Sequence, residues 1–190
     1  MAKKELEPAA MLFPTPVVLV TTVSSEGKPN VLTVTCIGIA CAKPPMIAIA
    51  IHPWTHSHAL LKELGEFVVN IPPEGILEAV KYCGRASGKN EDKFAGARLT
   101  PVPASKVKPP LIAECPVNLE CRTKHVLQLG IHSLFIGEVV ATHVDEHVLV
   151  DAAKGVLDVE KCAPITCVKG IGAYRSLGKT ITPIARAPHP

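Results

Sequence analysis

Segments with the composition of β-strands follow one another along most of the chain, with turns between them. β-branched and other apolar residues dominate each segment, and clusters of glycine, proline, serine or asparagine separate them. We predict strands over residues 16–23, 31–40, 44–53, 66–72, 116–130 and 131–144, and one more within 163–179. Regular alternation of strand and helix is missing, which disfavours a doubly wound parallel sheet. The pattern favours a mainly β fold built as a closed or partly closed antiparallel barrel.

Two short helices are predicted between the strands. Thr55 is a suitable N-cap for a helix that Gly65 ends. The second helix covers residues 74–84, and its apolar side chains recur at the spacing of one face. Those side chains are Ile76, Leu77, Val80 and Cys83. Residues 85–110 are predicted to form a long basic loop, and such loops in compact domains often carry function.

Two of the predicted strands have informative burial patterns. Residues 44–53 form a continuous apolar run bounded by prolines, which indicates burial on both faces. Residues 116–130 instead alternate, so apolar and polar side chains lie on opposite faces. The apolar face carries Val117, Leu119 and Cys121, and the polar face carries Asn118, Glu120, Arg122 and Lys124.

Length and composition indicate one globular domain over residues 1–190. Hydrophobic residues make up 47% of the 190-residue chain, which argues against disorder. The net charge of +3 is too small to indicate a nucleic-acid partner. Glu5 and Glu7 stand where a signal peptide would be apolar, and prolines interrupt the least charged stretch, so we expect no membrane segment and a cytoplasmic location.

Seven cysteines are present, and none forms a Cys-x-x-Cys pair. An odd count without a secretion signal disfavours a disulfide framework. Iron–sulfur spacing fails after Cys36 and Cys41, and again after Cys162 and Cys167. Buried reduced thiols are the simpler interpretation, and we predict no metal site. Two zinc alternatives stay open. One uses His52, His56 and His58, and the other uses Cys115, Cys121, His125 and His132.

The sequence gives little support for a nucleotide-binding loop or for a hydrolase site. The stretch GIGAYR at residues 170–175 has Arg175 where the third glycine of a dinucleotide loop belongs, and no strand–helix–strand unit follows it. Walker A, Gly-x-Ser-x-Gly and His-Glu-x-x-His motifs do not occur.

The start of the first helix has an unusual composition. His56, Ser57 and His58 occupy its first turn, where proteins commonly place an acidic residue. Unpaired backbone N–H groups and the helix dipole give this end a partial positive charge. The site therefore suits an external anion such as a phosphate, with ordinary capping as the alternative.

The order of the quoted elements resembles the flavin reductase-like family, an FMN-binding split barrel with short inserted helices, and its flavoredoxin subgroup in particular. The resemblance covers about residues 12–178 and leaves a proline-rich tail at 179–190. It rests on PTPVVLVTTVSSEGKPN, KPPMIAIAI, FVVNIP, DKF, IHSLFIGEV and YRSLG, which occur in the family's order.

The resemblance implies a set of FMN-binding residues. Ring contacts are expected from Thr35, Cys36, Ala40, Cys41 and Ala42. Ribityl and phosphate contacts are expected from Thr55, His56 and Ser57 at the helix start, and from Lys93, assisted by Lys89 or Arg85. Asn30 and Thr33 resemble neighbouring positions, Trp54 and Tyr174 are the aromatic candidates, and His132 matches a histidine close to the reacting rings.

The resemblance also implies assembly and activity. Residues 29–61 carry one formal charge, Lys43, and the family forms homodimers with flavin at the subunit interface. We expect an NAD(P)H-dependent flavin reductase that passes electrons through FMN to an acceptor. The alternative is a non-enzymatic flavoredoxin-type carrier that exchanges electrons with protein partners.

Overall fold

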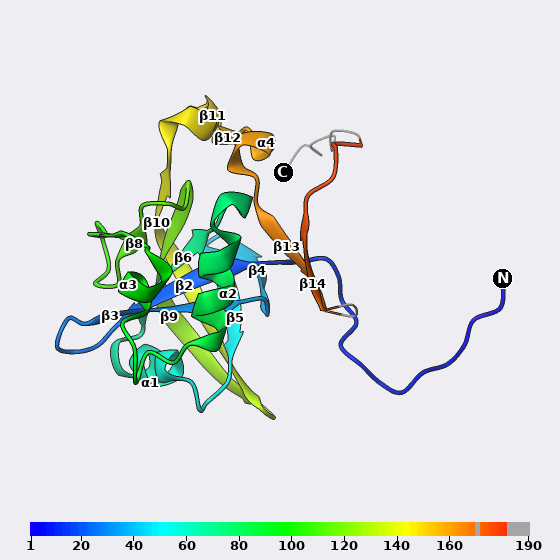
Figure 1. The fold of residues 1–190 in the computed structure, drawn as a ribbon, viewed down its shortest axis with the longest axis horizontal. Coiled ribbons are helices and arrows are strands. Elements are labelled where there is room, and N and C mark those ends of the chain that lie inside the picture. The colour runs from blue at the N-terminus through cyan, green and yellow to red at the C-terminus, as the bar shows by residue number, and fades with distance from the viewer. Residues whose placement is uncertain (170–171, 182–190) are drawn as a thin grey trace.

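A seven-stranded antiparallel sheet forms the body of the computed structural model, which describes residues 1–169 and 172–181 (Figure 1). The strand order is β3-β2-β6-β9-β10-β5-β4. These strands are β2 (Val18–Val23), β3 (Pro29–Val34), β4 (Ile37–Ala42), β5 (Pro45–Ile51), β6 (Glu66–Ile71), β9 (Val117–Leu129) and β10 (His132–Val144). The mainly β fold predicted from the sequence is confirmed, and β9 and β10 pair as the expected hairpin.

Smaller elements surround this sheet. The short strands are β1 (Thr15–Pro16), β13 (Ile165–Val168) and β14 (Ala173–Ser176) in one sheet, β7 (Pro101–Val102) with β8 (Leu111–Ile112), and β11 (Leu149–Asp151) with β12 (Val156–Leu157). The helices are α1 (His56–Leu64), α2 (Leu77–Arg85), α3 (Lys93–Ala97) and α4 (Val159–Cys162), with 3-10 turns η1 (Glu74–Ile76) and η2 (Glu146–Val148). Among the described residues, no helix is long and apolar enough to span a membrane.

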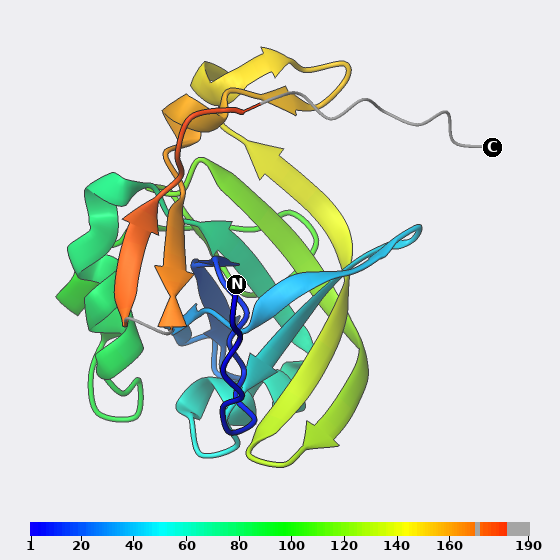
Figure 2. The same cartoon turned by 90° about the vertical axis from the view of Figure 1, so that its right-hand side faces the viewer.

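The wall of the barrel opens where the chain stops pairing with β2 and begins to pair with β5. The strand predicted over 31–40 is two strands, because β3 pairs with β2 whereas β4 pairs with β5. Between them, the Ala50 backbone N–H donates to the Cys36 carbonyl oxygen at 2.8 Å, which ties the bend to β5. Beyond this bond the β4–β5 hairpin projects from the barrel (Figure 2). The bend therefore opens the barrel wall at residues 35–36.

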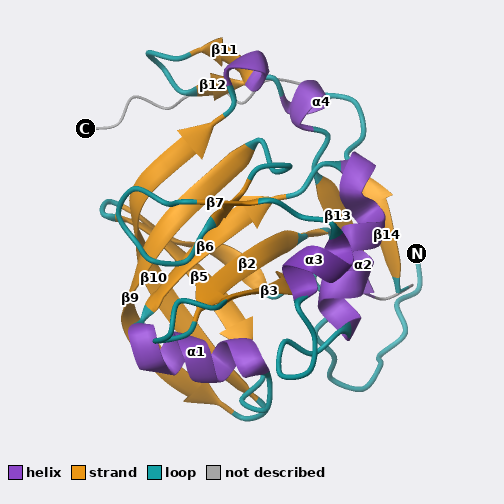
Figure 3. Cartoon of the chain, turned by 60° about the vertical axis from the view of Figure 1, so that its left-hand side comes forward, coloured by secondary structure: helices purple, strands orange, loops and turns teal. Residues whose placement is uncertain are grey.

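Alternation along β2 divides the core into two layers. Val18 and Val20 point into the barrel with Phe67 and Phe135, and all four are buried. Val17 and Leu19 point outwards and pack against Val80 and Phe94 of α2 and α3. Figure 3 shows α2 and α3 together beside the sheet, and α1 near one end of the barrel. Packing within these two layers holds the start of α1 and the end of α2 beside β3.

Both predicted helices form. Thr55 Oγ1 accepts a hydrogen bond from the His58 backbone N–H, and Gly65 adopts the left-handed conformation that ends α1. The second helix begins with the η1 turn, and Val80 and Cys83 are fully buried on its inner face. Ile76 and Leu77 pack at the edge of the same cluster, as the spacing predicted.

Two further local predictions need correction, and a third falls mostly outside the described residues. Residues 85–110 are not one loop, because the Asp92 side chain caps α3 within them. Strand β5 is buried at Ile49 and Ile51 but only half-buried over 46–48, so burial on both faces is wrong for the single chain. The tail at 179–190 lies mostly outside the described residues, as does part of the 170–175 stretch.

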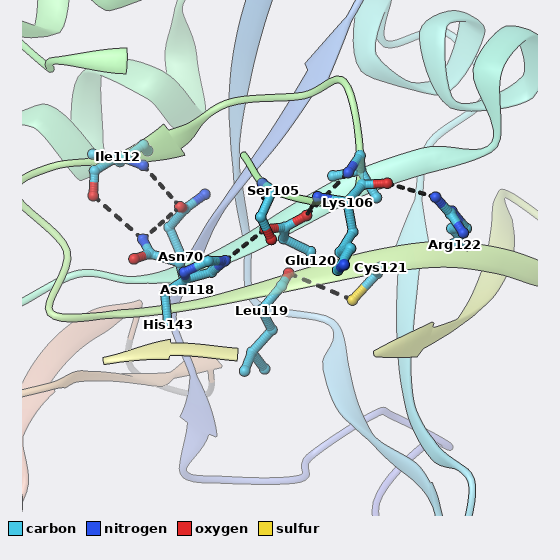
Figure 4. Close-up of polar contacts among 11 residues, drawn as sticks. Asn70, Ser105, Lys106, Ile112, Asn118, Leu119, Glu120, Cys121, Arg122 and His143 are labelled. Carbon is cyan, nitrogen blue, oxygen red and sulfur yellow. Dashed lines mark hydrogen bonds and ion pairs between the residues drawn. The ribbon is translucent and has the colours of Figure 1, made fainter. Parts of the chain in front are cut away.

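The polar face of β9 is covered at Asn118 and Glu120 but exposed at Arg122 and Lys124. Glu120 is fully buried under the segment that leads into β8 (Figure 4). Its carboxylate accepts hydrogen bonds from Ser105 N and Oγ, both at 2.8 Å, from Lys106 N at 2.6 Å and from Val107 N at 3.0 Å. His143 Nε2 contacts the same carboxylate at 2.5 Å. Glu120 therefore makes four of the hydrogen bonds that hold the segment to the barrel, and Glu66 accepts a further one from Lys108 N at 2.9 Å.

The hydrogen bonds decide the charge state of Glu120. Burial opposes the charge most strongly, but the donors from Ser105, His143 and Lys106 together outweigh it and lower the pKa to about 2. Because the folded-state pKa is depressed, the stabilisation is present above the ordinary carboxyl pKa. It is lost as the pH falls through about 4.5 towards about 2.

Replacing Glu120 with Gln should therefore destabilise the protein in a pH-dependent way. At pH 7 we expect a loss of about 2 to 3 kcal/mol in the free energy of unfolding, measured by urea denaturation. The difference from the unsubstituted protein should shrink as the pH is lowered towards the folded-state pKa. Glu138→Gln, which removes a partly exposed ion pair with Lys124, should change stability by about 0.5 kcal/mol or less. If the loss in the free energy of unfolding were as large near the folded-state pKa as at pH 7, this account of Glu120 would be contradicted.

Candidate functional site

Two adjoining cavities open where α1 begins and α2 ends, beside β3. We call them the Lys93 cavity, of about 230 Å³, and the His132 cavity, of about 440 Å³. The Lys93 cavity is lined by Asn30, Leu32, Trp54, Thr55, His56, Ser57, residues 84–88 and Lys93. The His132 cavity is lined by residues 32–36, residues 50–52, Trp54, Thr55, Gly84, His132 and Lys169. Because they share Leu32, Trp54, Thr55 and Gly84, the two cavities form one continuous candidate site.

Polar groups at the α1 N-terminus are aimed at the Lys93 cavity. Ser57 is 2% exposed, and its Oγ accepts a hydrogen bond from Asn30 Nδ2 at 2.7 Å. Asn30 Nδ2 also donates to Thr22 Oγ1 at 3.1 Å, whereas Asn30 Oδ1 is buried without a partner among the described residues. A buried acceptor without a donor is costly, so this oxygen suits a ligand hydroxyl.

A glycine allows the next loop to cover Asn30. A Cβ atom at Gly88 would lie 2.1 Å from Asn30 Oδ1, far closer than real side chains allow. The loop after α2 can approach the amide this closely only because the side chain is missing. Gly88 therefore contributes to the wall of the Lys93 cavity.

Lys93 is the most informative charge in the site. It is 4% exposed, and its Nζ donates to the Cys83 carbonyl oxygen at 2.6 Å. Burial lowers its pKa, which the nearby Cys83 and Glu91 counteract in part. None of the ion pairs in the described part of the chain includes Lys93. A buried ammonium without a carboxylate is costly unless an external anion accompanies it.

Further positive charge surrounds the start of α1. Burial lowers the pKa of His56 first, and the cations of Lys89, Lys28 and Lys93 lower it further. Arg85 lines the same cavity. The opening turn of α1 carries no acidic side chain and adds its dipole to this field. The Lys93 cavity is thus electropositive from several directions.

Aromatic rings form one wall of the His132 cavity. The His52 ring lies between Trp54, at a centroid distance of 4.2 Å, and His132, at 3.9 Å. His52 Nδ1 lies 2.9 Å from the Ile131 carbonyl oxygen, which can only accept, so this nitrogen carries the proton. Burial lowers the pKa of His132 first, and the charges of His52 and Lys169 lower it further. The stack presents a flat ring surface to the cavity, and the lowered pKa of His132 favours its neutral form.

Most of the predicted site residues come together here. Lining the two cavities are Asn30, Thr33, Thr35, Cys36, Trp54, Thr55, His56, Ser57, Lys93 and His132. Lys89 acts on His56 through its charge without lining either cavity. Ala40, Cys41 and Ala42 lie on the projecting part of β4, outside both linings, because the chain turns away after residue 36. Tyr174 packs against the α2 cluster and lines a separate cavity with Leu77.

The zinc alternatives find no support in this geometry. His58 turns away from the cavity, where its Nε2 lies 2.8 Å from Ser133 Oγ and its ring contacts Phe135. Cys115 and Cys121 are buried apolar thiols, and burial raises the pKa of Cys121 to about 12. Over residues 1–169 and 172–181, no group of three or more metal-ligating side chains is found.

Sequence reasoning missed several residues that line the site. The sequence indicates His52 only as a possible zinc ligand, although its place directly after an apolar strand is a signal for the cavity. Gly84, Gly88 and Lys169 gave no signal in the sequence, because only the folded chain brings them to β3.

Comparison with known proteins decides the family. The family model described as the flavin reductase like domain matches residues 10–159. The chain belongs to the flavin reductase-like family. Flavoredoxin of Desulfovibrio vulgaris (Miyazaki F) is similar in structure, with a TM-score of 0.89, 34% identity, and coverage of 96% of this chain and 97% of that one. The split barrel expected from the resemblance is thereby confirmed.

Two further proteins are similar in sequence. An uncharacterized protein of Archaeoglobus fulgidus is 41% identical over 124 residues, which are 65% of this chain and 70% of the relative. A protein named flavin reductase (NADH) of Kitasatospora aureofaciens is 32% identical over 129 residues, or 68% of this chain and 65% of the relative.

Proposed function

We propose that this protein binds FMN across the two cavities and acts as an NAD(P)H-dependent flavin reductase. Membership of the flavin reductase-like family supports a flavin ligand. The single observation that carries the proposal is Lys93, a buried cation without a carboxylate partner among the described residues, facing a cavity at a helix N-terminus. A phosphate group is the anion that such an arrangement suits.

The polar groups of the Lys93 cavity fit the phosphate end of FMN. The Ser57 hydroxyl accepts from Asn30, so its own proton is free to donate to a phosphate oxygen. Lys93 and the backbone N–H groups of the α1 start supply charge and further donors. The unpartnered Asn30 Oδ1 can accept from a ribityl hydroxyl. The residues present therefore fit the group.

The His132 cavity fits the flat ring. Thr35 and Cys36 bring the backbone of the bend to the cavity, and the stacked rings form another wall. Bound FMN supplies the hydride and one-electron chemistry, which side chains alone do not. Here the chain's own part is to hold the ring at the open edge of the barrel and to keep its phosphate neutralised.

His132 and Trp54 are the proposed contacts for the electron donor. Trp54 is 66% exposed and stacks on His52, which in turn stacks on His132. A nicotinamide ring can pack on such a surface without any charged group. Burial lowers the pKa of His132 and so favours its neutral form, in which the ring can accept or donate a hydrogen bond at the edge of the cavity.

A flavoredoxin-type electron carrier is the second candidate. The similarity to Desulfovibrio vulgaris flavoredoxin over 96% of this chain favours it. In this alternative, FMN stays bound and the electrons come from a protein partner that docks at the exposed Trp54. The cavities and the phosphate site serve both functions equally.

Anaerobic mixing with nicotinamides separates the two functions. FMN-loaded protein is mixed with NADH or NADPH, and the flavin absorbance is followed over time. A reductase should bleach rapidly and then turn over when free flavin or ferric iron is added. Slow bleaching with both nicotinamides, combined with rapid reduction by dithionite, would contradict the reductase and leave the carrier.

Lys93→Met should weaken FMN binding through the phosphate alone. We expect a loss of about tenfold or more in FMN affinity, measured by fluorescence quenching, which corresponds to about 1.4 kcal/mol or more. Riboflavin has the same ring without the phosphate, so its affinity should change by about threefold or less. Lys81→Met, which removes an exposed lysine paired with Glu78, is the matched control and should leave both affinities unchanged. An equal loss for both flavins would place the phosphate elsewhere.

A homodimer is part of the proposal. Large apolar side chains stay exposed on the β4 strand and on the end of the β9–β10 hairpin. They are Ile39, Val126, Leu127, Leu129 and Ile131. Covering them needs a second surface, and a copy of the same chain offers one of matching character. In such a dimer, the projecting β4 brings Ala40, Cys41 and Ala42 within reach of the partner's cavity.

Ile39→Glu should therefore dissociate the dimer. Light scattering at micromolar concentration should give the mass of two chains for the unsubstituted protein and of one chain for this variant. Val150→Glu alters another exposed apolar side chain, on β11, and should remain dimeric. A single-chain mass for the unsubstituted protein would refute the dimer.

The remaining expectations stay part of the proposal. A cytoplasmic location agrees with seven cysteines that are all free thiols. We also propose that residues 1–190 form one functional domain, of which the family match covers 10–159.

A further inference from the structure

Cys36 and Lys169 meet at the wall of the His132 cavity. They are 133 residues apart in the sequence, yet Lys169 Nζ lies 2.8 Å from Cys36 Sγ. Both side chains line the cavity, and Cys36 is half-buried while Lys169 is exposed. A thiol and a primary amine in direct contact, at a surface that small molecules can reach, form a reactive pair.

The other cysteines lack this combination. Burial raises the pKa of Cys83 to about 11 and that of Cys121 to about 12, so these thiols stay protonated and enclosed. Cys115 and Cys162 are buried as well, and the half-buried Cys167 packs against the core cluster that includes Val80. Cys41 is half-buried, but its sulfur contacts the Lys43 carbonyl oxygen rather than an amine. In the described part of the chain, Cys36 is the thiol with a lysine amine at its sulfur.

We propose that Cys36 and Lys169 are a modification site, where oxidation by a peroxide joins the two side chains covalently. In the first step, the Cys36 thiol attacks hydrogen peroxide, the O–O bond breaks, and sulfenic acid and one water form. In the second, the neutral Lys169 amine attacks the sulfur, an S–N bond forms, and the hydroxyl leaves as a second water. Sulfur is oxidised by two electrons and the peroxide is reduced. The known condensation of sulfenic acids with a backbone nitrogen is the same chemistry.

The position of the pair gives the cross-link a structural consequence. Cys36 lies at the bend where β3 gives way to β4, and Lys169 directly follows β13. A covalent bond is shorter than the present 2.8 Å contact, so it would draw β13 towards the bend. The wall of the His132 cavity would then be fixed. An effect on flavin chemistry rests on the proposed function, whereas the cross-link itself does not.

Peptide mass spectrometry of the full-length protein tests the proposal. The protein is treated with hydrogen peroxide at alkaline pH, where more amine is neutral, then alkylated and digested with trypsin. We expect the peptide with Cys36 joined to one with Lys169, about 2 Da below the sum of the reduced peptides, because two hydrogens are lost. Trypsin should fail to cut after Lys169, since its amine is no longer free.

Three variants identify the bonded atoms. Lys169→Arg keeps the positive charge and should abolish the linked peptide, as should Cys36→Ser. Cys167→Ser should retain it, which excludes a disulfide to the neighbouring Cys167. Recovery of Cys36 only as sulfenic or sulfinic acid, or in a disulfide with Cys41 or Cys167, would overturn the proposal.

Repeating the oxidation with FMN at saturation separates this proposal from the proposed function. A ring placed beside Cys36 should shield the thiol and lower the yield of linked peptide severalfold. An unchanged yield would contradict the ring position while supporting the cross-link. No linked peptide in either sample would overturn the cross-link and leave FMN binding unaffected.

Discussion

The change of strand partner at residues 35–36 is the constraint on which the remaining structure depends. Backbone groups must find partners, so a chain that leaves β2 after Val34 has to pair elsewhere, and it pairs with β5. The hydrogen bond from the Ala50 N–H to the Cys36 carbonyl oxygen lies where the chain changes from pairing with β2 to pairing with β5. Had β3 continued straight, the wall would have had no opening there. The opening lets Thr35 and Cys36 line the His132 cavity, and it places Cys36 beside Lys169.

Charged and polar groups form the second part of the candidate site, in the Lys93 cavity. A helix N-terminus, a hydroxyl and several cations converge on the Lys93 cavity, and Lys93 itself is buried there. Burying that ammonium costs free energy, and a bound anion would offset this cost. Glu120 differs from Lys93, because its buried carboxylate accepts hydrogen bonds from backbone N–H groups of its own chain. Glu120 holds a segment of its own chain, whereas Lys93 has no carboxylate partner among the described residues, which is why we propose that it binds an external anion.

Local sequence patterns predicted the elements well where a single physical rule governs them. Thr55 and Gly65 delimit α1 because capping and left-handed glycine act within one turn of chain. Patterns failed where distant segments decide the outcome. The run over 31–40 reads as one strand, since nothing local marks a change of partner. Asn118 and Glu120 read as a polar exposed face, and only the segment that folds over them makes them buried.

For the site, the sequence by itself determined which chemical groups are available: an acid-free helix start, a basic segment with Lys93, and small residues around Cys36. Those features follow from the residue order and from rules that act over a few residues. Only the tertiary structure decided which of them meet. It brought His52, Gly88 and Lys169 to the cavities and carried Ala40, Cys41, Ala42 and Tyr174 away from them. The physical reason is that proximity between residues far apart in the sequence depends on strand pairing and packing, which no local pattern encodes.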